Sequence, residues 1–285
     1  MNIYATLDDL RKYIEITDTS KTADDPLLIR SARIASTTID EECGRHFYPL
    51  LATQTYDRPH HFELWFDDDV LAVTSITNGD GTSVASTAYV LRPNNYYPKY
   101  KLDLLRTSGV VWQISSTGND AQAISLIATL GYNKNWATAW QTSDAIADAA
   151  GINASVTTIT VSDADGADEN GMTPRFQVGQ LIKIESEYLW VIAVTAASTN
   201  TLTVRRAMNG TTAASHATGT AIYNYRPMYD IQQATLRLTK WLYNQRDSNG
   251  QFDRAMITAD GTKILPYAMP DDIRGFYSHY IKGVR

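Results

Sequence analysis

The spacing of apolar residues at the start of the chain predicts two helices. Thr6 followed by Asp9 resembles a capping box, in which two side chains satisfy free N–H groups at a helix start, and a short helix to about Ile16 follows. Pro26 then opens a longer helix, which Gly44 ends. The apolar stripe of this longer helix consists of Leu28, Ala32, Ala35, Ile39 and Cys43. Cys43 is therefore predicted to be a buried packing residue.

From about residue 52 to residue 130 the apolar residues recur at every second position, as in strands with one buried face. Phe62, Leu64 and Phe66 follow this rule, and the segment 124–130 repeats it. The run Asn78-Gly79-Asp80-Gly81 predicts a hairpin-type turn between strand candidates at 73–76 and 89–91. This part of the chain is predicted to form an antiparallel sheet.

A second group of strand candidates follows a change in composition. Residues from about Thr142 to Ala154 are small and polar, which predicts a connection into a separate unit. Five short strand candidates come next, at 156–161, 181–185, 188–195, 201–205 and 220–223. Short strands of this kind are typical of a small barrel or sandwich.

Helical spacing returns at Pro227. The first predicted helix ends at Ser248-Asn249-Gly250, and its apolar face consists of Ile231, Ala234, Leu238, Trp241 and Leu242. The last predicted helix follows Pro270 and runs from about Asp271 to Ile281. Its apolar stripe consists of Ile273, Phe276, Tyr277, Tyr280 and Ile281, and nearby positive charge comes from Arg274, Lys282 and Arg285.

The order of these elements predicts an α+β fold: a helical layer with an antiparallel β region, plus an inserted small all-β domain, either a barrel or a sandwich. The two opening helices alone have too little apolar surface to cover a sheet, so the helix after Pro227 is expected to complete the layer. Residues 1–140 and 226–285 would then form one discontinuous core domain. Residues 150–225 would form the inserted domain, which is expected to fold independently.

Composition excludes several classes of protein. The chain has 285 residues, 44% of them hydrophobic, so it can bury a core. Its net charge of -6 argues against a protein whose main task is to grip nucleic acid. The single cysteine excludes an internal disulfide and a thiolate zinc cluster. Without a secretion signal or a membrane-length apolar run, a soluble protein made in a cytoplasm, with no membrane contact, is expected.

Two features invite a chemical interpretation. The acidic run Asp163–Glu169 fails the calcium-loop template, because the required glycine and glutamate are replaced by Asp168 and Pro174, so a solvated acidic loop is expected. His60 and His61 point to opposite sides of an extended strand, which favours surface or interface residues. No nucleophile elbow, metal-binding helix or phosphate loop occurs. We therefore expect no enzyme, with no catalytic, cofactor-binding or metal-binding residue and no cofactor, although a triad of distant residues stays open.

Several segments resemble phage head-tail connector (adaptor) proteins of tailed bacteriophages. The segments that carry this resemblance are 4–14, 25–28, Cys43-Gly44-Arg45-His46-Phe47-Tyr48, Leu130-Gly131-Tyr132, Pro227 with 230–234, and 265–273. The middle of the chain, at 176–184, 187–191, 200–206 and 209–216, is similar to a β module of phage structural proteins. Ala207 departs from this module, which commonly has glycine there.

The resemblance implies a homo-oligomeric ring, usually a dodecamer, at the virion neck of a particle assembled in a bacterial host cytoplasm. Such a ring sits below the portal protein, continues the DNA channel, lets DNA pass without specific binding, and attaches a downstream neck or tail-completion protein. Closed rings need two different surfaces on each subunit. The last helix is the expected portal-docking element, through Ile273, Phe276, Tyr277, Tyr280, Ile281, Arg274, Lys282 and Arg285. The alternative is that the apolar stripe of this helix packs on its own subunit.

Two other functions stay open. The β module could bind a receptor or a carbohydrate on a virion, or the chain could be an unrecognised hydrolase. The 17 tyrosines and 6 tryptophans suit either ordinary burial or subunit contact, because aromatic side chains bury a large area with little loss of entropy.

Overall fold

The computed structural model describes residues 2–18, 20–245, 256–257, 263–264 and 271–283. Within these residues the fold is mixed α+β and mostly β, with four α-helices, a five-stranded sheet and a six-stranded sheet, both antiparallel. The α+β part of the predicted fold class is therefore confirmed. A further short pair, β12 (Met256–Ile257) and β13 (Lys263–Ile264), is also antiparallel.

The chain divides into two compact units. Unit 1 comprises Met1–Gly44, Gln141–Arg206 and Ala213–Arg285, and unit 2 comprises Arg45–Trp140 and Ala207–Thr212. Unit 1 thus contains the helices together with the six-stranded sheet. The independent folding of residues 150–225 stays a prediction.

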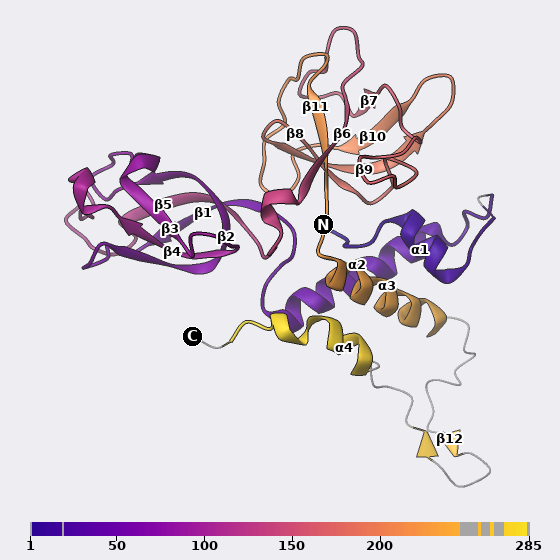
Figure 1. Cartoon of the computed structure of the whole chain (residues 1–285), viewed down its shortest axis with the longest axis horizontal. Helices are drawn as coiled ribbons and strands as arrows, with labels where there is room; N and C mark the ends of the chain where they lie inside the picture. The colour runs from indigo at the N-terminus through magenta and orange to yellow at the C-terminus, as the bar shows by residue number, and fades with distance from the viewer. Residues whose placement is uncertain (1, 19, 246–255, 258–262, 265–270, 284–285) are drawn as a thin grey trace. The chain divides into compact units, whose positions relative to one another are not determined.

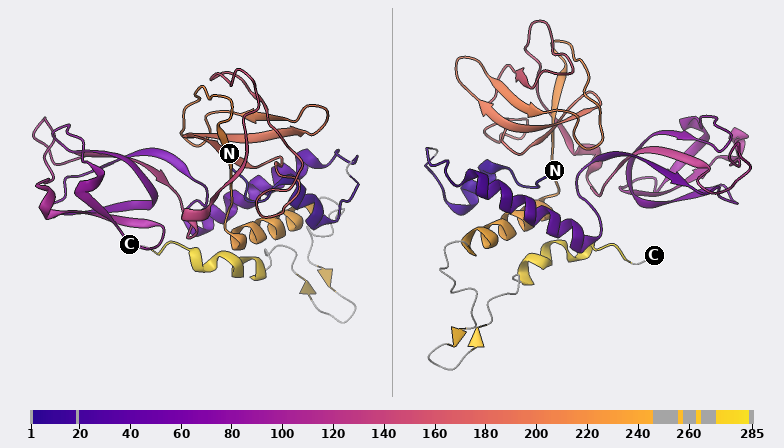
Figure 2. Two further views of the ribbon diagram at one scale, coloured as in Figure 1. Left: turned by 45° about the horizontal axis from the view of Figure 1, so that its top comes forward. Right: turned by 180° about the vertical axis from the view of Figure 1, so that it is seen from behind.

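The helices of unit 1 are α1 (Leu7–Ile14), α2 (Asp25–Cys43), α3 (Tyr229–Asn244) and α4 (Asp271–Tyr277). Figures 1 and 2 show α3 lying beside α2, and α4 also packs on α3. All five residues of the predicted α2 stripe are completely buried. On α3, Ile231, Ala234 and Leu238 are buried as predicted, whereas Trp241 and Leu242 are partly exposed. The predicted end of this helix at Ser248-Asn249-Gly250 lies outside the described residues.

Both predicted caps of the opening helices are present. Thr6 Oγ1 accepts a hydrogen bond from Asp9 N at 3.2 Å, and Asp9 Oδ2 accepts one from Thr6 N at 3.5 Å, which completes the capping box. Gly44 ends α2 with φ 62°, in the left-handed region that glycine tolerates best. Local sequence therefore determines where these two helices begin and end.

Replacing Thr6 with alanine is expected to lower the free energy of unfolding by about 1 kcal/mol, the usual cost of losing an N-cap side chain. Urea denaturation followed by circular dichroism would measure it. The matched control is Thr37→Ala, which removes an exposed threonine from within α2. Equal stability of the Thr6 variant and the wild type would show that the cap contributes nothing.

The sheet of unit 2 has the order β1-β5-β2-β4-β3. Its strands are β1 (Leu50–Tyr56), β2 (Glu63–Thr77), β3 (Tyr89–Arg92), β4 (Lys99–Leu104) and β5 (Ile124–Leu130). Leu64 and Phe66 of β2 are buried with Leu102 of β4 and Leu126 of β5 in one apolar cluster. The apolar residues that were predicted to alternate along β2 and β5 thus point toward the core, and the residues between them point to the other face of the sheet.

The predicted turn at Asn78 forms, but the predicted hairpin is wrong. Asn78 N donates to Thr82 O at 2.8 Å, and a bridge joins Thr77 to Ser83. The next strand, β3, nevertheless pairs with β4. The reason is that β2 already has β5 on one side and β4 on the other, so it has no edge left for β3.

The six-stranded sheet of unit 1 has the order β6-β11-β8-β9-β10-β7. Its strands are β6 (Trp140–Ala145), β7 (Thr158–Thr160), β8 (Leu181–Ile184), β9 (Glu187–Thr195), β10 (Thr201–Arg205) and β11 (Ala221–Tyr225). The last five match the predicted strands. β6 is a correction, because it overlaps the start of the segment, from about Thr142 to Ala154, that was expected to be a connection. It is an edge strand with few apolar residues, so it shows no alternation.

The two edges of this sheet meet only briefly. A bridge joins Ile146 to Val161, and Ala147 N donates to Thr160 O at 2.8 Å. Over the described residues β6 and β7 are not paired as strands, so the sheet is not a closed barrel. Its apolar side is one buried cluster that includes Ile159, Phe176 and Ile182.

Candidate functional site

The C-terminal segment expected to dock on a partner is a shorter helix than predicted. α4 ends at Tyr277, and a 3-10 turn, Ser278–Tyr280, follows it. The predicted continuous helix to Ile281 is therefore wrong. Contacts with α2 and α3 redirect the chain: Lys282 N donates to Cys43 O at 2.8 Å, and the Tyr280 hydroxyl donates to Asp230 at 2.7 Å.

The apolar stripe of this segment packs mainly on its own unit. Ile273, Tyr277 and Tyr280 are 2%, 0% and 4% exposed. The Tyr277 hydroxyl donates to Glu42 Oε2 at 2.8 Å, and burial together with the Glu42 charge raises the pKa of Tyr277. These three residues hold the segment against α2 and α3.

The other docking candidates are more accessible. Ile281 is 52% exposed, Phe276 is partly exposed, and Arg274 is exposed while it donates to Glu42 Oε1 at 3.2 Å. Lys282 is partly exposed, and Arg285 lies outside the described residues. Among the apolar docking candidates, Ile281 is thus the residue whose substitution is expected to lower the stability of the subunit least.

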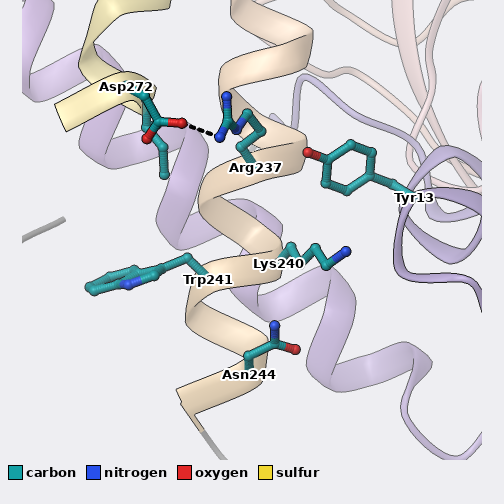
Figure 3. Close-up of a pocket in the computed structure, with 7 residues that line it drawn as sticks. Tyr13, Arg237, Lys240, Trp241, Asn244 and Asp272 are labelled. Atoms are coloured by element: carbon teal, nitrogen blue, oxygen red, sulfur yellow. Dashed lines mark hydrogen bonds and ion pairs between the residues drawn. The ribbon is translucent and has the colours of Figure 1, made fainter. Parts of the chain in front are cut away.

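A recess of about 340 Å³ lies between α3, the end of α1 and the start of α4 (Figure 3). Arg237 and Asp272 form an ion pair on its wall, and Trp241 also lines it. Lys240 Nζ lies 5.3 Å from the centre of the Tyr13 ring. The lining therefore combines cations with aromatic rings, which suits an acidic or aromatic group of a partner better than it suits acid–base catalysis.

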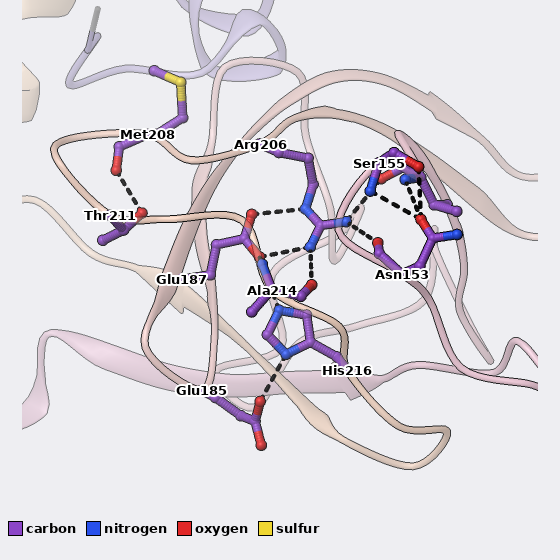
Figure 4. Close-up of polar contacts among 10 residues, drawn as sticks. Asn153, Ser155, Glu185, Glu187, Arg206, Met208, Thr211, Ala214 and His216 are labelled. Atoms are coloured by element: carbon purple, nitrogen blue, oxygen red, sulfur yellow. Dashed lines mark hydrogen bonds and ion pairs between the residues drawn. The ribbon is translucent and has the colours of Figure 1, made fainter.

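A buried ionic cluster lies in the six-stranded sheet, and the sequence did not indicate it (Figure 4). Glu187, the first residue of β9, is completely buried and accepts two hydrogen bonds from Arg206, at 2.7 and 2.6 Å. His216 is 4% exposed and lies between two carboxylates: Nδ1 is 2.7 Å from Glu185 Oε2, and Nε2 is 2.9 Å from Glu187 Oε2. The cluster thus combines four ionisable side chains, of which only Glu185 is substantially exposed.

Arg206 also connects three backbone segments. Its guanidinium donates to the carbonyl oxygens of Asn153, Val156 and Ala214 at 2.9, 2.9 and 2.6 Å. With the two bonds to Glu187, all five N–H groups of the side chain have an acceptor. The cluster therefore fixes the strand ends and the loops around them.

The loop between Arg206 and Ala214 contains strained backbone. Ala207 has φ 54° and Asn209 has φ 51°, both in the left-handed region that side chains disfavour. Ala207 is the position where similar β modules commonly have glycine, and its φ is the kind that glycine adopts without strain. Alanine therefore stands in place of glycine at a position whose left-handed backbone conformation must be held by surrounding contacts.

The acidic loop is less solvated than predicted. Asp163 pairs with Arg175 at 3.2 Å, and the side chain of Asp168 is only 4% exposed in its ion pair with Arg226. His60 and His61 are both exposed. Within the described residues, no three His, Cys, Asp or Glu side chains are grouped so that they could hold a metal ion.

Comparison with known proteins gives little further guidance. No family model matches the chain, and no curated protein matches it. Among solved structures, the chain is similar to one described as "Neck of empty GTA particle computed with C6 symmetry". The match has 16% identity and a TM-score of 0.32, and covers 47% of this chain and 68% of the other. This TM-score is too low to assign the fold, so function is inferred from the chain's own residues. In the described part of the chain, no helix is both long and apolar enough to cross a membrane.

Proposed function

We propose that the chain is a structural subunit of a virion neck, a head-tail connector that forms a ring below the portal, continues the DNA channel and attaches a downstream neck or tail-completion protein. The observation that carries the proposal is the helical core of unit 1. Its α1 and α2 come from the start of the chain, and its α3 and α4 come from the end. The segments that resemble connector proteins supply its caps and several of its buried residues, among them Leu10, Cys43 and Ala234.

The accessible part of the C-terminal segment supports portal docking. Ile281 offers exposed apolar surface, and positive charge in the same segment comes from its chain neighbour Lys282 and from the exposed Arg274, which pairs with Glu42. A hydrophobic anchor surrounded by charge is the arrangement that gives an interface both affinity and a fast encounter. Ring closure, usually of twelve copies, then uses other surfaces of the subunit.

A structural role also fits the buried ionic cluster. Glu187 and His216 carry the kinds of groups that acid–base catalysis uses, but both are buried and bonded to each other, and Glu187 is also paired with Arg206. A substrate could not reach them without opening the sheet, and catalytic groups must lie within hydrogen-bond reach of the substrate. We therefore propose that the chain is not an enzyme.

Cryo-electron microscopy of the particles that contain the chain would test the proposal. We expect a ring of this chain between the portal and the tail, with DNA or its channel passing through the centre. The alternative function, a virion β-domain that binds a receptor or a carbohydrate, predicts density at the periphery of the particle instead. A peripheral location, or a single copy away from the channel, would overturn the connector proposal.

A further inference from the structure

One face of α3 forms a wall of the recess described above. Four side chains make up this face, which we call the exposed stripe of α3: Arg237, Lys240, Trp241 and Asn244. Their spacing of three and four residues places them on the same side of the helix, and Figure 3 shows Tyr13 of α1 next to Lys240. All four are partly or largely exposed, whereas the buried residues of α3 lie at other positions. The exposed stripe of α3 is thus accessible to a partner.

The two cations of this stripe differ in how they are neutralised. Arg237 forms an ion pair with Asp272 at the start of α4, and its guanidinium also lies 5.6 Å from the centre of the Phe276 ring. Lys240 has no acidic partner among the described residues, and its ammonium lies over the Tyr13 ring. Two cations and one carboxylate therefore line the recess. This leaves one net positive charge there, in a chain whose net charge is -6.

Trp241 adds apolar surface next to Lys240 in the chain. Its indole is partly exposed, although the apolar pattern of the helix predicted that it would pack in the core. Exposed tryptophan is uncommon on protein surfaces outside interfaces, and tryptophan is enriched among the residues that carry most of the binding energy of an interface. An unpaired cation beside such a ring suits a ligand with two parts, a carboxylate and an apolar side chain.

We propose that the exposed stripe of α3 is a docking groove for an acidic segment of a partner protein, in which a carboxylate pairs with Lys240 and a neighbouring apolar side chain packs on Trp241. Charge complementarity favours a protein carboxylate over nucleic acid. Gripping a phosphate backbone takes a series of cations, and one of the two cations here is already paired with Asp272. The groove binds such a segment whether or not the chain forms a neck ring, so the proposal goes beyond the connector role.

Fluorescence anisotropy of a labelled peptide, titrated with the full chain, would test the groove. The probe is a terminally blocked pentapeptide in which a central phenylalanine is flanked by aspartates. The comparison peptide has asparagine in place of every aspartate. At low ionic strength we expect a Kd below about 1 mM for the acidic peptide, and binding weaker by about tenfold or more for the asparagine peptide.

Two variants should shift the affinity for the acidic peptide in opposite directions. Lys240→Gln removes the unpaired ammonium and should weaken binding by about tenfold. Asp272→Asn removes a competing carboxylate and frees Arg237, so it should strengthen binding by about threefold. Both side chains are at least partly exposed, so both variants are expected to fold. Lys21→Gln is the matched control, because it removes the same charge from a side chain that is 76% exposed and lies outside the recess, and it should leave the affinity unchanged.

The proposal would be overturned by a Kd of the acidic peptide above about 1 mM, by equal affinity of the wild type and the Lys240 variant, or by equal affinity of the two peptides. Two other occupants would overturn it as well. An oligothymidylate of about ten nucleotides that binds more tightly than the peptide, and depends on Lys240, would make the groove a nucleic-acid site. Self-association of the chain that Lys240→Gln abolishes would make the occupant a second copy. None of these results decides the neck role, which the position of the chain in particles tests.

Discussion

Replacing Arg206 with methionine is expected to lower the free energy of unfolding by about 3–5 kcal/mol, the cost of removing one partner of a buried ion pair. Glu187 is completely buried, and without Arg206 it loses both charged hydrogen bonds to its carboxylate, while the contacts with His216 and the N–H of Ala214 remain. Three backbone carbonyl oxygens lose their donor as well. Urea denaturation of the full chain at constant pH would measure the effect.

Arg205→Met is the matched control, because Arg205 is the exposed neighbour of Arg206. Its substitution should change the free energy of unfolding by about 0.5 kcal/mol or less. The double variant Glu187→Gln, Arg206→Met should cost less than the sum of the two single variants, because the second change no longer leaves a buried charge alone. If the Arg206 and Arg205 variants were equally stable, the cluster would not stabilise the fold.

The elements that could be predicted from the sequence are those that local residues determine. The α2 stripe from Leu28 to Cys43 repeats at helical spacing, and the same residues are buried in the structure. Gly44 and the Thr6 capping box define helix ends through their own backbone and side chains. The strands of the six-stranded sheet from β7 to β11 were visible as short apolar runs between turn residues.

The features that were missed depend on residues far apart in the sequence. Glu187 is 19 residues from Arg206 and 29 residues from His216, so no local spacing connects them. β6 is an edge strand whose polar residues carry no alternation, and its place follows from pairing with β11. The pairing of β3 with β4 is likewise decided by which sheet edge is free. The end of α4 depends on contacts with α2 and α3, and helix propensity takes no account of such tertiary contacts.

The packing of α4 changes how its docking role must be tested. Replacing Phe276 and Tyr280 together would not separate docking from folding, because Tyr280 is buried and bonded to Asp230. Tyr277 is completely buried, so Tyr277→Ala is expected to destabilise the subunit by about 3–5 kcal/mol, as truncation of a buried aromatic residue does. A loss of portal binding in these variants would therefore report on unfolding rather than on the docking surface.

Ile281→Glu should separate the two roles. Ile281 is 52% exposed, so this change should leave the free energy of unfolding within about 0.5 kcal/mol of the wild type. Under the proposed function, it places a charge in the portal interface and should weaken portal association by on the order of 2 kcal/mol, or roughly 30-fold. Ile192→Glu is the matched control, because Ile192 is 49% exposed and lies on β9 of the six-stranded sheet, not in the helical core that holds the docking segment. Binding of the purified variants to the portal by surface plasmon resonance would measure both. Unchanged affinity of a folded Ile281 variant, or equal loss in the Ile192 variant, would remove the C-terminal segment from the portal interface.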